Sequence, residues 1–153
     1  MSHPGTGTYQ ALNRLPTILY RSLPMYLANT SPWTRPGDER AIEALRHIVE
    51  DQERLATRVA QYIIDHYGRV ELGDYPLDFP DTHDLAFDFL IGKLVACQKS
   101  DVAALEQCVA ALQPDREALQ LAEEALGSAR AHLETLEELA AETAKEGVSW
   151  AKS

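Results

Sequence analysis

The chain has 153 residues, the usual length of one domain built around one hydrophobic core. Apolar residues make up 45% and charged residues 25%, a globular composition that excludes the low-hydrophobicity, high-charge class of disordered chains. Acidic residues outnumber basic ones 24 to 14, which gives a formal net charge of −10. Because such a field repels phosphate backbones and anionic lipid surfaces, neither nucleic acid nor a membrane is expected as a partner.

The N-terminal part of the chain predicts a short arm followed by a broken helix. Residues 1–8 are rich in glycine and threonine and predict a flexible arm. Apolar residues recur at helical spacing from Tyr9 onward, but Pro16 and Pro24 must each start a helix or kink it. The first helix, over residues 9–28, is therefore expected to be kinked.

Three further helices follow, each bounded by turn or capping residues. Asp38 offers an N-cap for a second helix over residues 39–67, which Gly68 ends. Asp81 can cap a third helix that runs to about Leu112, and a tight turn at residues 113–115 leads into a last helix that reaches about Ala144. The sequence thus predicts an all-α, single four-helix-bundle domain over residues 9–145 and a C-terminal tail over residues 146–153.

The lengths of the connections predict how the helices are arranged. Short connections before Asp38 and around Pro114 make helices one and two antiparallel, and likewise helices three and four. About thirteen extended residues between helices two and three reach roughly 43 Å, which matches the length of a helix of about 29 residues at about 1.5 Å per residue. A long crossover that leaves helices two and three parallel is therefore predicted. The alternation of apolar and polar residues over 70–79 predicts an extended strap laid on the bundle.

Polar residues interrupt the apolar stripes of three helices. Gln52 lies within the stripe of helix two, Gln98 and Asp101 lie on that of helix three, and His132 lies on the margin of that of helix four. Counting the rise along each helix in the crossover arrangement brings all four to one layer near the middle of the bundle. A buried polar group costs free energy unless it is paired, so these residues are the candidate site.

Two interpretations of this layer are open. In the first, Gln52, Gln98, Asp101 and His132 form a hydrogen-bonded network that fixes helix register, with Asp101 paired to His132 or to an arginine such as Arg21. In the second, Glu53, Asp101 and His132 are ligands of a metal ion, supported by Glu50 or Glu137.

The pattern resembles the ferritin-like superfamily, including its rubrerythrin-like members. The resemblance covers residues 9–145 in architecture, and in wording it rests on residues 49–56 (VEDQERLA) and 129–136 (ARAHLETL). These stretches are similar to the surroundings of the two Glu-x-x-His motifs of that superfamily. The resemblance implies a di-iron or di-manganese centre, with one Glu from each of two helices and a Glu-x-x-His from each of the others.

This chain departs from that pattern in three helices. Helix two offers Glu50-x-x-Glu53, with a carboxylate at the histidine position, and helix four offers Ala129-x-x-His132, without the glutamate. Residues 9–28 contain no acidic residue. Because a pair of hard metal ions needs several carboxylates, the metal-site motif is interpreted as degraded, with one metal ion or none.

The function expected from the sequence is a non-enzymatic ferritin-like bundle that acts as a structural or protein-interaction module without a cofactor. The alternative is a metal-binding protein for iron, manganese or zinc sequestration or for peroxide chemistry, and a third idea is a bundle that holds a small apolar ligand. Gly92 and Gly127 on outer helix faces leave room for a homodimer. Cys97 and Cys108 face the core, and without a disulfide framework, an apolar leader or a long apolar run, a cytoplasmic location is expected.

Overall fold

The structure is a computed structural model that describes residues 6–30, 39–74 and 87–151. It contains five helices, α1 (Thr6–Tyr20), α2 (Leu23–Thr30), α3 (Glu39–Tyr67), α4 (Phe87–Ala111) and α5 (Arg116–Ala151), and no strand within those ranges. The all-α prediction is confirmed. The count is five rather than four because the first predicted helix is divided into α1 and α2.

The break between α1 and α2 has a direct cause in the sequence. Pro24 has no N–H to donate to the carbonyl of Tyr20 four residues earlier, so the hydrogen-bond ladder of α1 cannot continue through it. The new helix is capped by Ser22, whose Oγ accepts a hydrogen bond from the backbone N–H of Met25 at 3.3 Å. The predicted kink is confirmed at Pro24, whereas Pro16 lies inside α1 without ending it.

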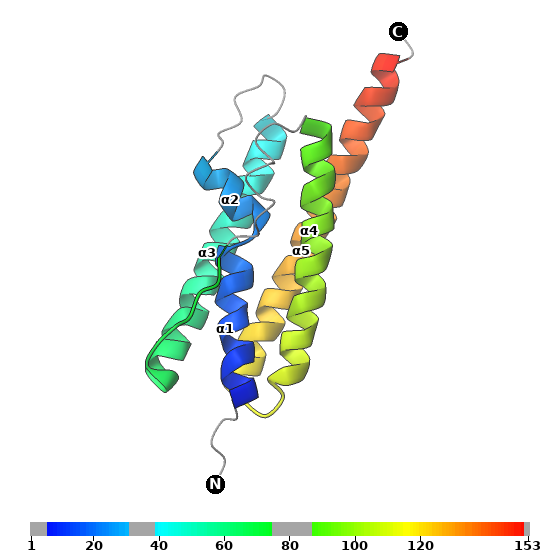
Figure 1. The fold of residues 1–153 in the computed structure, drawn as a ribbon. Coiled ribbons are helices and arrows are strands. Elements are labelled where there is room, and N and C mark those ends of the chain that lie inside the picture. The colour runs from blue at the N-terminus through cyan, green and yellow to red at the C-terminus, as the bar shows by residue number, and fades with distance from the viewer. Residues whose placement is uncertain (1–5, 31–38, 75–86, 152–153) are drawn as a thin grey trace.

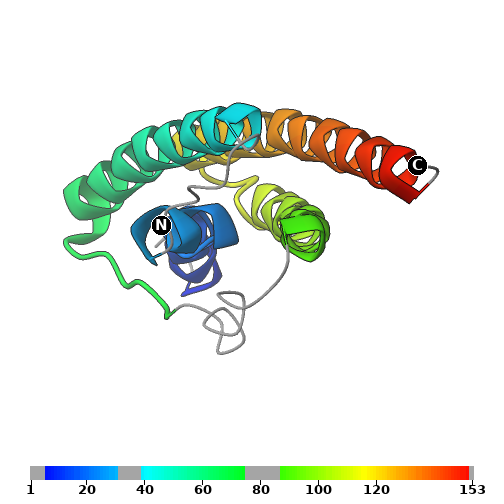
Figure 2. The same cartoon turned by 90° about the horizontal axis from the view of Figure 1, so that it is seen from above.

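The four longer helices pack side by side in alternating directions (Figure 1). Helices α1 and α5 run one way along the bundle, and α3 and α4 run the other way. Each of the four packs chiefly against two neighbours, in the order α1, α3, α5, α4 and back to α1, and α1 also makes a smaller contact with α5. Viewed from above, α3 and α4 are therefore diagonally opposite (Figure 2), and they run parallel, the direction predicted from the long connection between them.

The ends of the helices agree with the sequence in some places and not in others. The bounds of α3 are those predicted, and Gly68 ends it with φ of +88°, a left-handed conformation that suits glycine. Helix α1 begins at Thr6 rather than Tyr9, because Thr8 is also buried. Helix α5 continues to Ala151 rather than 144, since no proline stops it, and its last turns project past the start of α4 (Figure 1). The predicted start of the third helix, at residues 81–86, lies outside the described residues.

Residues 69–74 form an extended strap along α1. Asn13 Oδ1 accepts a hydrogen bond from the N–H of Glu71 at 2.8 Å, and Thr17 Oγ1 accepts one from the N–H of Gly73 at 3.1 Å. Arg21 then donates to the carbonyl of Gly73 at 2.9 Å. The strap thus climbs α1 in the direction opposite to α3, as a crossover requires, while residues 75–79 of the predicted strap lie outside the described residues.

A ladder of polar contacts fixes the register of α3 against α5. Going along α3, Arg40 contacts Glu142 at 2.6 Å, Asp51 contacts His132 at 2.9 Å and Arg58 contacts Glu124 at 2.5 Å. Tyr62 then donates to Asp115, which caps the start of α5 through the N–H of Ala118. Residue numbers rise along α3 as they fall along α5, so the two helices are antiparallel.

The described helices differ in length and in apolar content. None of them is both long and apolar enough to cross a membrane.

Candidate functional site

A layer of polar side chains divides the hydrophobic core into two clusters. The first cluster reaches Leu19 in α1, Leu55 in α3, Val102 in α4 and Ala129 in α5. The second cluster begins at Leu23 of α2, Ile48 of α3, Leu94 of α4 and Leu136 of α5. Between these limits lie Ser22, Gln52, Gln98, Asp101 and His132, which we call the polar layer.

Gln52 is buried on α3 and is held by the break between α1 and α2. Its Oε1 accepts a hydrogen bond of 2.7 Å from the hydroxyl of Ser22. The same hydroxyl oxygen accepts the capping N–H of Met25, so one side chain both starts α2 and satisfies a buried amide. Ser22 was not identified from the sequence, although a serine just before a Leu-Pro pair is a recognisable capping signal.

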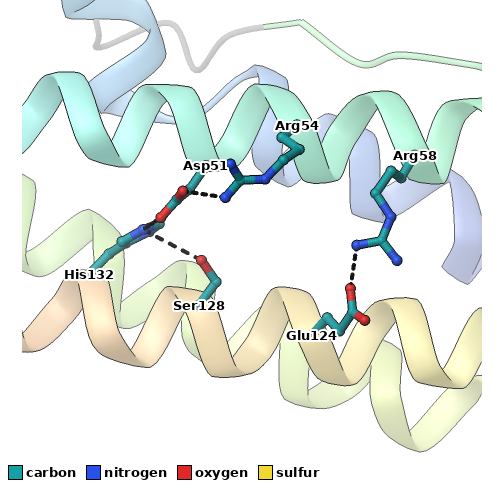
Figure 3. A network of polar contacts seen from close by, with 6 residues as sticks. All are labelled: Asp51, Arg54, Arg58, Glu124, Ser128 and His132. Carbon is teal, nitrogen blue, oxygen red and sulfur yellow. Dashed lines mark hydrogen bonds and ion pairs between the residues drawn. The ribbon is translucent and has the colours of Figure 1, made fainter.

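His132 is buried on α5 and joins that helix to α3 through Asp51 (Figure 3). His132 Nε2 lies 2.9 Å from Asp51 Oδ2 and 3.4 Å from the Oγ of Ser128, and Arg54 donates to Asp51 Oδ1 at 2.5 Å. Burial acts to raise the pKa of Asp51, but the hydrogen bonds and charges of His132 and Arg54 outweigh it. The pKa of Asp51 therefore lies below its ordinary value.

Gln98 is buried on α4 with only half of its amide satisfied. Its Nε2 donates to the carbonyl of Ala129 on α5 at 3.0 Å, which joins these two helices at the level of the layer. Its Oε1 is buried and, within the described part of the chain, accepts no hydrogen bond. A buried acceptor without a donor costs free energy, so this atom marks a site where a ligand would be stabilising.

Asp101 lies one helical turn beyond Gln98, and its carboxyl has neither a hydrogen bond nor a charge partner among the described residues. Burial raises the pKa of Asp101 to about 7, because nothing in the described residues offsets the loss of hydration. The predicted partner, His132, is engaged with Asp51 instead. Neither expected partner of Asp101 is found beside it among the described residues, since His132 contacts Asp51 and Arg21 donates to the carbonyl of Gly73.

The polar layer surrounds a small cavity to which all four long helices contribute. Gln52, Gln98, Asp101, Ser128 and His132 line it, together with apolar side chains that include Ile18 and Leu19 of α1. Its volume is about 10 Å³, roughly the space of one water molecule. The four residues that helical spacing predicted for one layer are therefore brought together around one cavity.

Glu53 is the predicted site residue that the structure does not bring there. It is exposed on α3, and its neighbour Asp51 makes the contact with His132. The distinction was readable from the sequence. Asp51 is flanked at i−3 and i+4 by Ile48 and Leu55, which are buried, whereas the corresponding neighbours of Glu53, Glu50 and Thr57, are exposed.

The sequence pattern implied a metal ion bound by carboxylate and histidine side chains at this level of the bundle. Within the described ranges, no group of three or more His, Cys, Asp or Glu side chains is arranged to hold a metal ion. Of the supporting carboxylates, Glu50 and Glu137 are both exposed. The arrangement instead holds helices together: α3 to the α1–α2 break, α3 to α5, and α4 to α5.

The two cysteines are set apart from this layer. Cys108 is buried in the first cluster and Cys97 is partly buried. Burial raises the pKa of the Cys108 thiol, although the charge of Arg14 acts in the opposite direction. A thiol with a raised pKa is a poor nucleophile, so Cys108 has the properties of a small core residue.

Comparisons with known proteins were made at the levels of family, sequence and structure. No family model matches the chain, and no curated protein or solved structure matches it either.

Proposed function

We propose that the protein is a non-enzymatic, ferritin-like helical bundle that acts as a structural or protein-interaction module. In this proposal the polar layer serves to hold the helices in one register, and the metal chemistry of the ancestral site has been lost. The protein then presents the outer faces of its helices, and not an interior reaction centre, to other molecules.

One observation carries the proposal: three of the four mid-bundle polar side chains, all but Asp101, are hydrogen-bonded to other elements of the bundle. Gln52 is bonded to Ser22, His132 to Asp51, and Gln98 to the carbonyl of Ala129. Each bond joins a different pair of elements at the level where two apolar clusters meet. A sliding helix would break such a bond and leave buried polar groups unpaired, which penalises other registers.

The ferritin-like part of the proposal rests on topology. The parallel, diagonal placement of α3 and α4, and a strap that climbs α1 from the end of α3, are what a ferritin-like crossover requires. The Glu50-x-x-Glu53 and Ala129-x-x-His132 stretches lie at the level of the layer, where such a bundle would hold its metal. They lack the histidine and the glutamate that complete that motif.

Substitution of His132 by Ala, together with metal analysis, tests the proposal. We expect His132→Ala to lower the free energy of unfolding by about 1–3 kcal/mol, because it removes a buried side chain and leaves Asp51 without its partner. His47→Ala is the matched control, since His47 is an exposed histidine on α3, and it should change stability by less than about 0.5 kcal/mol. Both are measured by urea unfolding at pH 7.

Elemental analysis of protein purified without chelator completes this test. We expect iron, manganese and zinc to be far below one atom per chain. Stoichiometric metal in the native protein that disappears in His132→Ala but stays in His47→Ala would contradict the structural role. It would favour a metal-binding protein that uses the polar layer.

A further inference from the structure

Two side chains whose oxygens accept no hydrogen bond from the described residues lie one helical turn apart on α4 and line the same cavity. Gln98 Oε1 is buried and accepts no hydrogen bond within the described residues, and the Gln98 side chain is 1% exposed. The Asp101 carboxyl is partly buried and has no donor or cation among those residues. Because side chains at i and i+3 of a helix are neighbours, one small species can reach both oxygens.

Among the charged side chains around the cavity, one negative charge has no positive partner. Among the described residues that line the cavity, the only titratable group from α5 is His132, which is directed to Asp51 of α3, and Asp51 is also bonded to Arg54. Helix α1 contributes Ile18 and Leu19, which carry no charge. The carboxylate of Asp101 on α4 is therefore the uncompensated charge of the layer, and its partial burial disfavours the charged form.

The size and charge of the cavity restrict the class of ligand. A volume of about 10 Å³ admits one body of roughly the size of water, which excludes a hydrated divalent ion. Calcium and magnesium carry two positive charges, and one carboxylate with one neutral amide oxygen would neutralise only half of that charge. A single positive charge matches the single uncompensated carboxylate.

We propose that the cavity is a binding site for one monovalent positive charge, held between the Asp101 carboxylate and Gln98 Oε1. Two sources supply this chemistry. One is a proton, carried as the carboxylic acid, whose O–H donates to Gln98 Oε1 directly or through one water. The other is a small cation such as Na⁺, K⁺ or NH₄⁺. This site does not depend on the structural role proposed above.

The test compares the native chain with Asp101→Asn, which removes the charge and keeps the shape. Glu53→Gln is the matched control, because it removes an exposed carboxylate next to the layer. The unfolding equilibrium is measured in an ion arm at pH 8, with NaCl, KCl or NH₄Cl against choline chloride at one ionic strength. A proton arm in choline chloride runs from pH 8 to pH 5.

We expect the native chain and Glu53→Gln to be stabilised in one of these arms, and Asp101→Asn to respond much less. If the source is a proton, acidification from pH 8 to pH 5 should lower the unfolding constant of the native chain roughly a hundredfold more than that of Asp101→Asn. If the source is a cation, NaCl, KCl or NH₄Cl should stabilise the native chain more than Asp101→Asn, whereas choline chloride should stabilise neither. Equal responses of native chain and Asp101→Asn in both arms would overturn the proposal.

A second variant and a spectroscopic readout cover the case in which Asp101→Asn does not fold. Gln98→Met removes the other acceptor at similar volume and should weaken the same response. In the native chain, the carboxyl carbon of Asp101, observed by NMR, should either titrate near neutral pH or shift on addition of one of the cations. A carboxyl signal that titrates with an ordinary aspartate midpoint and ignores all three cations would also overturn the proposal.

Discussion

Asp51 carries the contact that positions His132, although only part of its side chain is shielded from water. Its carboxylate accepts from His132 of α5 and from Arg54 of α3, with 37% of the side chain exposed. Exposed ion pairs contribute little, because water screens them and long side chains lose freedom. The pair stabilises the fold chiefly because the His132 side chain is 9% exposed and would otherwise be buried without a partner.

We therefore expect Asp51→Asn to lower the free energy of unfolding by about 1 kcal/mol at pH 7, allowing for the exposure of the carboxylate. Glu53→Gln removes an acidic residue from the same helix two positions later and should change stability by less than about 0.5 kcal/mol. Urea unfolding of both variants measures the difference. Equal losses would mean that Asp51 acts only through the general charge of α3.

The pH dependence of the Asp51 contribution has a definite sign. The pKa of this carboxyl is lower in the folded chain than its ordinary value of 3.8. Its contribution is therefore fully present above pH 3.8 and is lost as the pH falls through the lower, folded-state value. The stability difference between native chain and Asp51→Asn should therefore shrink as the pH falls below about 4. A difference that grows as the pH falls from about 4 to about 2 would contradict the pairing.

At the level of single residues, helical spacing located the layer but not its bonds. Gln52, Gln98, Asp101 and His132 could be assigned to one level because the rise along a helix is regular. The choice of Asp51 over Glu53 was readable from the apolar neighbours Ile48 and Leu55, but the individual hydrogen bonds were not, because they depend on how each helix is rotated against its neighbours. Ser22 was missed for another reason: its role depends on where the helix breaks at Pro24.

At the level of elements, α4 and α5 each contain a glycine that no packing requires. Gly92 and Gly127 are exposed inside their helices, and a Cβ added to either would meet nothing within 4 Å. Glycine in a helix interior is less favourable than alanine by about 1 kcal/mol, chiefly through backbone entropy. We expect Gly92→Ala and Gly127→Ala each to raise the free energy of unfolding by up to about 1 kcal/mol.

The same two variants examine whether a second copy of the chain packs on these faces. Urea unfolding at several protein concentrations, with sedimentation velocity, gives stability and association together. Ala131→Gly is the reverse control, since Ala131 is exposed on α5 and the change should lower stability by a similar amount. A loss of stability in either glycine variant that grows on dilution would contradict the expectation and would place a homodimer contact at that glycine.

The bounds of the elements could be predicted where a local signal ends them. Gly68 stops α3 at the predicted residue and Asp115 caps α5, because both signals act within one turn. The end of α5 could not be predicted from the apolar stripe, which stops near Ala140 while the backbone continues to Ala151. A helix continues beyond its buried stripe when no proline or capping residue stops it.

At the level of the whole molecule, the lengths of the connections predicted the directions of the helices, because only a long connection can join the ends of two parallel helices. The two antiparallel pairs follow from short connections, and the parallel pair follows from a connection long enough to run the length of the bundle. The sequence could not show where that crossover would lie. Its path is decided by Asn13 and Thr17, two polar residues on α1 whose side chains accept from the strap.

The strap offers a direct test of this topology through amide hydrogen exchange. The N–H groups of Glu71 and Gly73 belong to exposed residues outside any helix, and yet each donates to a side chain of α1. We expect both amides to exchange more slowly in the native chain than unstructured amides do.

Asn13→Ala should remove the protection at Glu71, and Thr17→Val that at Gly73, since neither replacement can accept a hydrogen bond. Gln10→Ala, on the exposed face of α1 beside the strap, is the control and should leave both amides protected. Unprotected amides in the native chain would mean that residues 69–74 do not lie along α1, and the observed direction of the crossover would lose its support. Protection that depends on Asn13 and Thr17 would instead establish that the chain turns back along α1 after α3, which is the step that makes α3 and α4 parallel.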